Sequence, residues 1–207
     1  MIYTNEEAIA FIEQCKEVHQ GNVDRGFWEN DRSNEELATL ICTELMEAVE
    51  ADRKGIRPND ISVSNVLDNF DAVVFKNVIK DTVEDEVADA AIRCMDYLGS
   101  IAIKDGVEDI ARLLYSRGQM MEQDAKELNL QCLSYSSICE ALGMLACMNF
   151  YSVFAKNSNS KDMMFAVVNT LLMLNFLSLK HYLNIENHIE LKLKYNATRP
   201  YKHGKKY

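Results

Sequence analysis

Residues 33–50 of the chain read SNEELATLICTELMEAVE, and this stretch sets the expectation for the fold. Ser33 followed three residues later by Glu36 is a signal for the start of a helix. Apolar residues then recur with helical spacing at positions 37, 40 and 41, and the same stripe would continue at 44, 47 and 48. Glutamates stand at two of these places, Glu44 and Glu47. A carboxylate that faces a core is costly unless it is paired, hydrogen-bonded or metal-bound. The pattern therefore predicts that these glutamates belong to a binding site for a metal ion.

A second acidic pair has the same spacing. Glu86 and Asp89 follow another cap candidate, Thr82 with Asp85, in a segment whose other positions are largely apolar. Two such pairs on facing helices would form a cage of carboxylate oxygens, the ligands that Mg²⁺ prefers. We therefore expect a magnesium site, with Mn²⁺ as the alternative ion, and its predicted ligands are Glu44, Glu47, Glu86 and Asp89.

The rest of the sequence predicts an all-α protein with a single domain over residues 1–207. Only two prolines and eight glycines interrupt the chain, and its long periodic segments show little strand-like alternation. A first helix is expected after Thr4, with Glu7 as its capping partner. The cysteines are scattered without a C-x-x-C pair and are predicted to be reduced core residues rather than disulfides or zinc ligands: Cys15, Cys42, Cys94, Cys132, Cys139 and Cys147.

The charge and hydropathy of the sequence indicate which classes of partner, and which cellular location, are expected. The formal net charge of −10 opposes binding to nucleic-acid polymers, because an acidic surface repels a phosphate backbone. Residues 163–179 are apolar but include Asn169 and Asn175, and they fall short of the ~20 residues that span a membrane. A buried bundle helix is expected there and no membrane contact. Because the first residues lack a signal-peptide pattern, the chain is expected in the cytoplasm.

The last segment, residues 192–207, is predicted to be a basic tail, since it carries six lysines and arginines and no acid. Basic side chains beside an acidic metal site suit a polyphosphate ligand. Arg199 is the best candidate for phosphate contact, because a planar guanidinium can hold a phosphate through two hydrogen bonds. For Lys205 and Lys206 a solvated chain end is expected.

The acidic motifs are also where the chain resembles a known family. E-x-x-E on one helix and E-x-x-D on a later one resemble the signature of MazG-type all-α nucleoside triphosphate pyrophosphatases. The resemblance covers residues 26–105, including Phe27 and Trp28, and returns in the closing stretch from Glu190 to Lys206. Thr43 stands where many members carry a further Glu. The spacer between the two motifs is longer than usual, which predicts an inserted loop or an extra helix.

The resemblance implies a reaction and a set of roles. It implies Mg²⁺-dependent cleavage between the α and β phosphates of a nucleoside triphosphate, with pyrimidine deoxynucleotides as the first choice of substrate. Water would be the nucleophile, and a ligand carboxylate or its neighbour Glu50 would accept its proton. Trp28 would either stack on the base or serve as a core residue. The expected catalytic residues are Glu44, Glu47 and Glu50, and the expected substrate contacts are Trp28, Arg93, Lys194, Asn196 and Arg199.

Residues 134–190 are a candidate second, degenerate copy of the unit at residues 26–105. When Cys42 is set on Cys139, Ala141 and Met144 take the places of Glu44 and Glu47, and Ala166 and Asn169 take those of Glu86 and Asp89. Related enzymes form active sites between helical hairpins of two subunits. A built-in repeat or a homodimer would supply the second hairpin.

The sequence lacks the motifs of several other classes of enzyme. The four histidines do not form the E-x-x-H pairs of a di-iron bundle. Neither a G-x-x-x-x-G-K phosphate loop nor a G-x-S-x-G elbow occurs in the sequence. The alternative to an enzyme is a catalytically silent helical module that binds a nucleotide or a protein partner.

Overall fold

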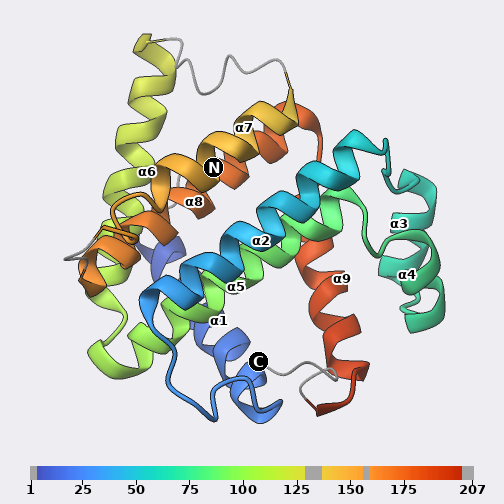
Figure 1. Cartoon of the computed structure of the whole chain (residues 1–207), viewed down its shortest axis with the longest axis horizontal. Coiled ribbons are helices and arrows are strands. Elements are labelled where there is room, and N and C mark those ends of the chain that lie inside the picture. Colours follow the sequence, from blue (N-terminus) through green and yellow to red (C-terminus); the bar gives the residue numbers. More distant parts are fainter. Residues whose placement is uncertain (1–3, 129–136, 156–158, 202–207) are drawn as a thin grey trace.

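In the computed structural model, which describes residues 4–128, 137–155 and 159–201, the chain is a bundle of helices, and no strand occurs within these ranges (Figure 1). The all-α prediction is confirmed. The helices are α1 (Asn5–Asp24), α2 (Asn34–Arg53), α3 (Asp60–Asp68), α4 (Ala72–Val78), α5 (Val83–Asp105), α6 (Glu108–Leu128), α7 (Ile138–Met144), a short π-helix η2 (Leu145–Asn149), α8 (Ser160–His181) and α9 (Ile185–Thr198).

The predicted helix starts are confirmed by their caps. The Ser33 hydroxyl accepts a hydrogen bond from the Glu36 amide, and the Glu36 carboxylate accepts one from the Ser33 amide, so α2 begins with a capping box. Thr4 forms the same arrangement at α1, and the Thr82 hydroxyl caps α5. These contacts satisfy amides that have no partner inside the helix. The cap at Thr82 places Glu86 in the first turn of α5.

The central element is α5, on which α1, α2, α8 and α9 all pack. It lies beside α2 across the middle of the molecule (Figure 1). Sixteen of its 23 residues are buried, which is typical of a helix enclosed on most sides. At Gly99 a Cβ atom would lie 2.1 Å from the carbonyl oxygen of Cys15, so the backbones of α1 and α5 are in direct contact there.

The long spacer between the acidic motifs, where the sequence predicted an inserted loop or an extra helix, forms two helices, α3 and α4. These helices pack on α9. The ring of Phe75 stacks on that of Tyr195, with centroids 4.6 Å apart. The insert therefore holds α9 in place through a small core of its own, which consists of Val63, Val66, Phe75, Ile79 and Leu191.

In the second half of the chain, α7 packs on α2 and α8 packs on α5. Ala141 and Ala166, which align with Glu44 and Glu86 in the predicted repeat, are each 1% exposed. Asn169 accepts a hydrogen bond of 3.1 Å from Arg117. These counterpart positions therefore carry no acid, although the duplication itself stays a prediction.

The apolar segment 163–179 lies inside α8. Among the described residues, α8 is the one helix long and apolar enough to cross a membrane by length and composition. About half of its most apolar window, 56%, is buried inside the protein. It packs there against α5, α6 and α7.

The cysteines within the described ranges are free thiols. Cys15 and Cys94 are buried, Cys42 and Cys139 are half-buried, and Cys147 is exposed. Burial raises the pKa of the Cys42 thiol to about 11, which keeps it protonated at neutral pH. Cys132 lies outside the described residues.

We expect Gly99→Ala to destabilise the protein by about 1–3 kcal/mol, because the added methyl group would overlap the backbone of α1. Urea unfolding monitored by circular dichroism would measure the loss. Gly143→Ala is the matched control, since no atom lies within 4 Å of a Cβ built at that helical position. This control should gain roughly 0.5–1 kcal/mol from helix propensity. Equal effects of the two substitutions would contradict the close contact.

Candidate metal centre

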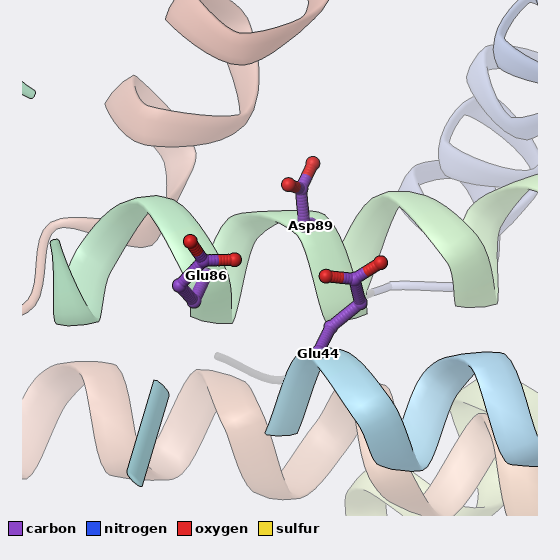
Figure 2. Close-up of side chains that lie close together, drawn as sticks. All are labelled: Glu44, Glu86 and Asp89. Carbon is purple, nitrogen blue, oxygen red and sulfur yellow. The ribbon is translucent and has the colours of Figure 1, made fainter. Parts of the chain in front are cut away.

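Three of the four predicted ligands come together between α2 and α5. Glu44 projects from α2 toward the face of α5 that carries Glu86 and Asp89 (Figure 2). Each of the three offers a carboxylate oxygen, and these oxygens lie within 4.8 Å of one another. Glu44 and Glu86 are each only 5% exposed. The site is therefore a largely buried group of oxygen donors.

The prediction that Glu47 faces the core is wrong, because its side chain is exposed. Residues three apart on a helix differ by about 60° in direction. The buried line of α2 runs through Ile41, Leu45 and Ala48, with Glu44 at its edge. Glu47 is therefore turned past the edge of the α2–α5 interface. It lines a cavity beside the acidic cluster that Glu44, Glu86 and Asp89 form.

Lys192, which we expected in a basic tail, lies inside the acidic cluster. Its Nζ atom is 2.6 Å from Oδ2 of Asp85 and 2.7 Å from Oδ2 of Asp89, and the residue is 3% exposed. Asp85 is fully buried and also accepts a hydrogen bond of 3.0 Å from the Asp81 amide. In the sequence, Lys192 stands seven residues after Ile185, on the buried stripe of α9. A lysine at such a position is the signal that could have identified it.

A second basic side chain contacts the cluster from α5. Nε and Nη2 of Arg93 each lie 2.5 Å from Oε1 of Glu44. Lys192 is thus paired with Asp85 and Asp89, and Arg93 is paired with Glu44. Within the described residues, no hydrogen bond or ion pair satisfies the Glu86 carboxylate itself.

The cluster carries more negative than positive charge. Glu44, Asp85, Glu86 and Asp89, when all ionised, exceed Lys192 and Arg93 by two charges. Burial raises the pKa of Glu86 to about 8 although Lys192 acts in the opposite direction. Burial likewise raises the pKa of Asp85 to about 6 against the effect of Lys192. At neutral pH the ion-free cluster therefore holds a proton on Glu86 in place of an ionic partner.

A cavity of about 690 Å³ opens beside the cluster, along α2 and the loop that precedes it. This volume lies within the range of small-molecule sites. Its lining combines apolar, cationic and acidic side chains, among them Phe27, Arg32, Leu40, Glu44, Glu47 and Arg93.

Trp28 has a structural role instead of lining this cavity. Its Nε1 donates hydrogen bonds to both Asp96 oxygens at 3.0 and 3.1 Å, and its ring lies edge-on to His19 with centroids 4.7 Å apart. Asp96 also accepts a hydrogen bond from Asn22 at 2.8 Å and lies 2.7 Å from Nδ1 of His19. Trp28 is half-buried and is tied to α5 through Asp96, whereas Phe27 is the aromatic side chain at the cavity.

Glu50, which we expected as a proton acceptor, is not brought to the cluster. Its carboxylate lies 2.9 Å from Nη1 of Arg53 and 3.2 Å from Nζ of Lys54, near the end of α2. These contacts lower its pKa, chiefly through Lys54. A helix rise of about 9 Å separates Glu50 from Glu44. Glu47 is only one turn from Glu44, so it is the better-placed acid to accept a proton at the cluster.

The C-terminal residues approach the cavity only in part. Lys194 is paired with Glu190 at 2.6 Å and lines a different groove. Arg199 donates a hydrogen bond of 3.4 Å to Asn196. Tyr201 donates a hydrogen bond to Glu29, beside Gly26 at the border of the cavity. Lys205 and Lys206 lie outside the described residues.

Comparisons with protein families, with curated proteins and with solved structures found no match for this chain. The resemblance carried by the acidic motifs therefore stays a prediction. The geometry and charge of the site have to support any function by themselves.

Replacing Glu86 by glutamine should flatten the pH dependence of stability in the presence of a chelator. Because the pKa of Glu86 is raised from 4.5 to about 8, the folded protein binds more protons than the unfolded chain between these values. The free energy of unfolding therefore falls as the pH rises through this window. At about pH 9 the variant should exceed the wild type by on the order of 1–3 kcal/mol in urea titrations. The control Glu47→Gln changes an exposed carboxylate, and its free energy of unfolding should depend on pH as that of the wild type does.

Proposed function

We propose that the chain is a Mg²⁺-dependent nucleoside triphosphate pyrophosphohydrolase that releases a nucleoside monophosphate and pyrophosphate. The observation that carries this proposal is the convergence of Glu44, Glu86 and Asp89 from two helices next to a cavity of nucleotide size. A buried, incompletely neutralised group of carboxylates is costly to fold. A function that uses the charge gives a reason for its presence.

The residues fit a divalent ion in two respects. All the candidate ligands are carboxylate oxygens, which suit Mg²⁺ or Mn²⁺ and not a soft metal. When all four carboxylates are ionised, their excess of two negative charges equals the charge of one such ion. Glu44, Glu86 and Asp89 would hold it, while Lys192 would keep its contact with Asp85.

A bound ion would supply charge neutralisation and a more acidic water. The chain's own side chains would do the rest. Glu47, exposed at the cavity and close to Glu44, would accept the proton of the attacking water. Arg93 reaches the same cavity and would hold a phosphate oxygen through its guanidinium.

The nucleoside would lie in the cavity between α2 and the loop before it. Phe27 and Leu40 offer apolar surface for a base. Asp96 on α5 fixes the loop by accepting the hydrogen bonds of Trp28, and it also accepts one from Asn22 of α1. Cleavage between the α and β phosphates, and the choice of pyrimidine deoxynucleotides, rest on the family resemblance alone.

The second candidate is a catalytically silent binding module. The ion pairs of Arg93 with Glu44 and of Lys192 with Asp89 favour it, because a structural network would contain the same contacts. The two functions differ in turnover. A purely structural network would also be indifferent to Mg²⁺, whereas a silent module can bind the ion without turnover and the proposed enzyme requires it for turnover.

Mg²⁺ should raise the melting temperature, because an ion that binds only the folded state stabilises it by mass action. At a hundredfold excess over its Kd the gain should be roughly 5–10 °C for a protein of this size. Asp89→Ala should abolish this gain. Glu50→Ala, at an acid outside the cluster on α2, should retain it. A melting curve that ignores Mg²⁺ in the wild type would rule out the ion site.

The reaction can be tested with a panel of nucleoside triphosphates and Mg²⁺ in ¹⁸O-labelled water. We expect a monophosphate and pyrophosphate, with the label in only one of them because water attacks a single phosphorus atom. Glu44→Gln should reduce kcat/KM on the order of a hundredfold or more, and Glu50→Gln should leave it nearly unchanged. Inorganic phosphate and a diphosphate as first products would refute the α–β assignment. No turnover by a sample that binds Mg²⁺ would favour the silent module.

A further inference from the structure

A second cavity lies on the face of α5 opposite the acidic cluster. It has a volume of about 680 Å³, and its α5 residues are Ala91 and Met95. On a helix these positions point about half a turn away from Glu86 and Asp89. The groove and the candidate metal centre are therefore separate sites.

The walls of the groove are the two helices α1 and α9, which both pack on α5. From α1 come residues 7, 10, 11 and 14, and from α9 come residues 185, 186, 189, 190, 193 and 194. Each set includes four residues with the i, i+3, i+4, i+7 spacing of one helix face, 7 to 14 on α1 and 186 to 193 on α9. Each wall is therefore about 10 Å long, or about two helical turns.

The groove is apolar at its base and acidic at its edges. Phe11, Leu171 and Ile189 are half-buried and line it. Glu7 on one wall and Glu186 on the other are exposed. Lys194 is the basic residue of the lining, and it is paired with Glu190 at 2.6 Å. The net charge of the edges is therefore negative on both sides.

We propose that this groove binds an amphipathic helix of a partner protein. Two rows of helical residues with an apolar base between them match the apolar face of about two turns of a third helix. The acidic edges fit lysine or arginine side chains at the borders of that face. The partner segment is thus a basic amphipathic helix with apolar residues at i, i+3, i+4 and i+7.

The proposal can be tested with a labelled synthetic peptide of about 14 residues that has leucine at the i, i+3, i+4 and i+7 positions and lysine elsewhere. Its affinity for the full chain would be measured by fluorescence anisotropy. Ala10→Phe fills the groove from an exposed position and should weaken binding about tenfold or more. Ala197→Phe, an exposed alanine of α9 outside the groove, should stay within about twofold of the wild type.

Charge is tested in the same assay. Glu186→Lys at the groove should weaken binding by roughly threefold, and this effect should fade at high salt. Glu17→Lys, an equal charge change on the exposed surface of α1, should have less effect. Melting curves would show that each variant is folded.

Three outcomes would overturn the proposal. Equal binding by Ala10→Phe and Ala197→Phe, or equal binding of a peptide with the same residues in shuffled order, would mean that the acidic surface attracts any basic peptide. A wild-type chain that sediments as a dimer, with Ala10→Phe as a monomer, would show that a second copy fills the groove.

Discussion

The contact of Lys192 with Asp85 and Asp89 is the interaction on which the rest of the site depends. The first turns of α5 bury several carboxylates, and buried charges without partners cost several kcal/mol each. Lys192 supplies the compensation from α9, 107 residues further along the chain than Asp85. Arg57 does the same for Glu84 at 2.6 Å, from the segment that leads into the insert. The acidic face of α5 is therefore stable only after the insert and α9 have docked on the bundle.

This dependence explains the position of the extra helices. α3 and α4 contribute none of the three candidate ligands, yet their small core includes Leu191, the neighbour of Lys192. The stacking of Phe75 on Tyr195 fixes α9 on the other side of that lysine. An inserted segment that looks peripheral in the sequence thus positions the cation at the centre of the site.

Patterns local to one helix could be predicted from the sequence. The caps at Ser33 and Thr82 and the shared face of Glu86 and Asp89 follow from helical spacing alone, and the structure confirms them. The prediction placed Glu47 in the core because the apolar stripe of a helix is broad. The spacing of residues does not show which border of the stripe the neighbouring helix covers. Lys192 and the Asp96 contacts of Trp28 join distant segments. Such pairings depend on tertiary packing, which one sequence does not display.

The direct backbone contact at Gly99 limits how the molecule can move. With no side chain between them, α1 and α5 cannot roll or slide past each other without a clash of backbone atoms. Asp96 ties the loop that carries Trp28 to the same pair of helices. Any widening of the cavity beside Glu44 would therefore displace α2 against this rigid pair, as a shear between packed helices.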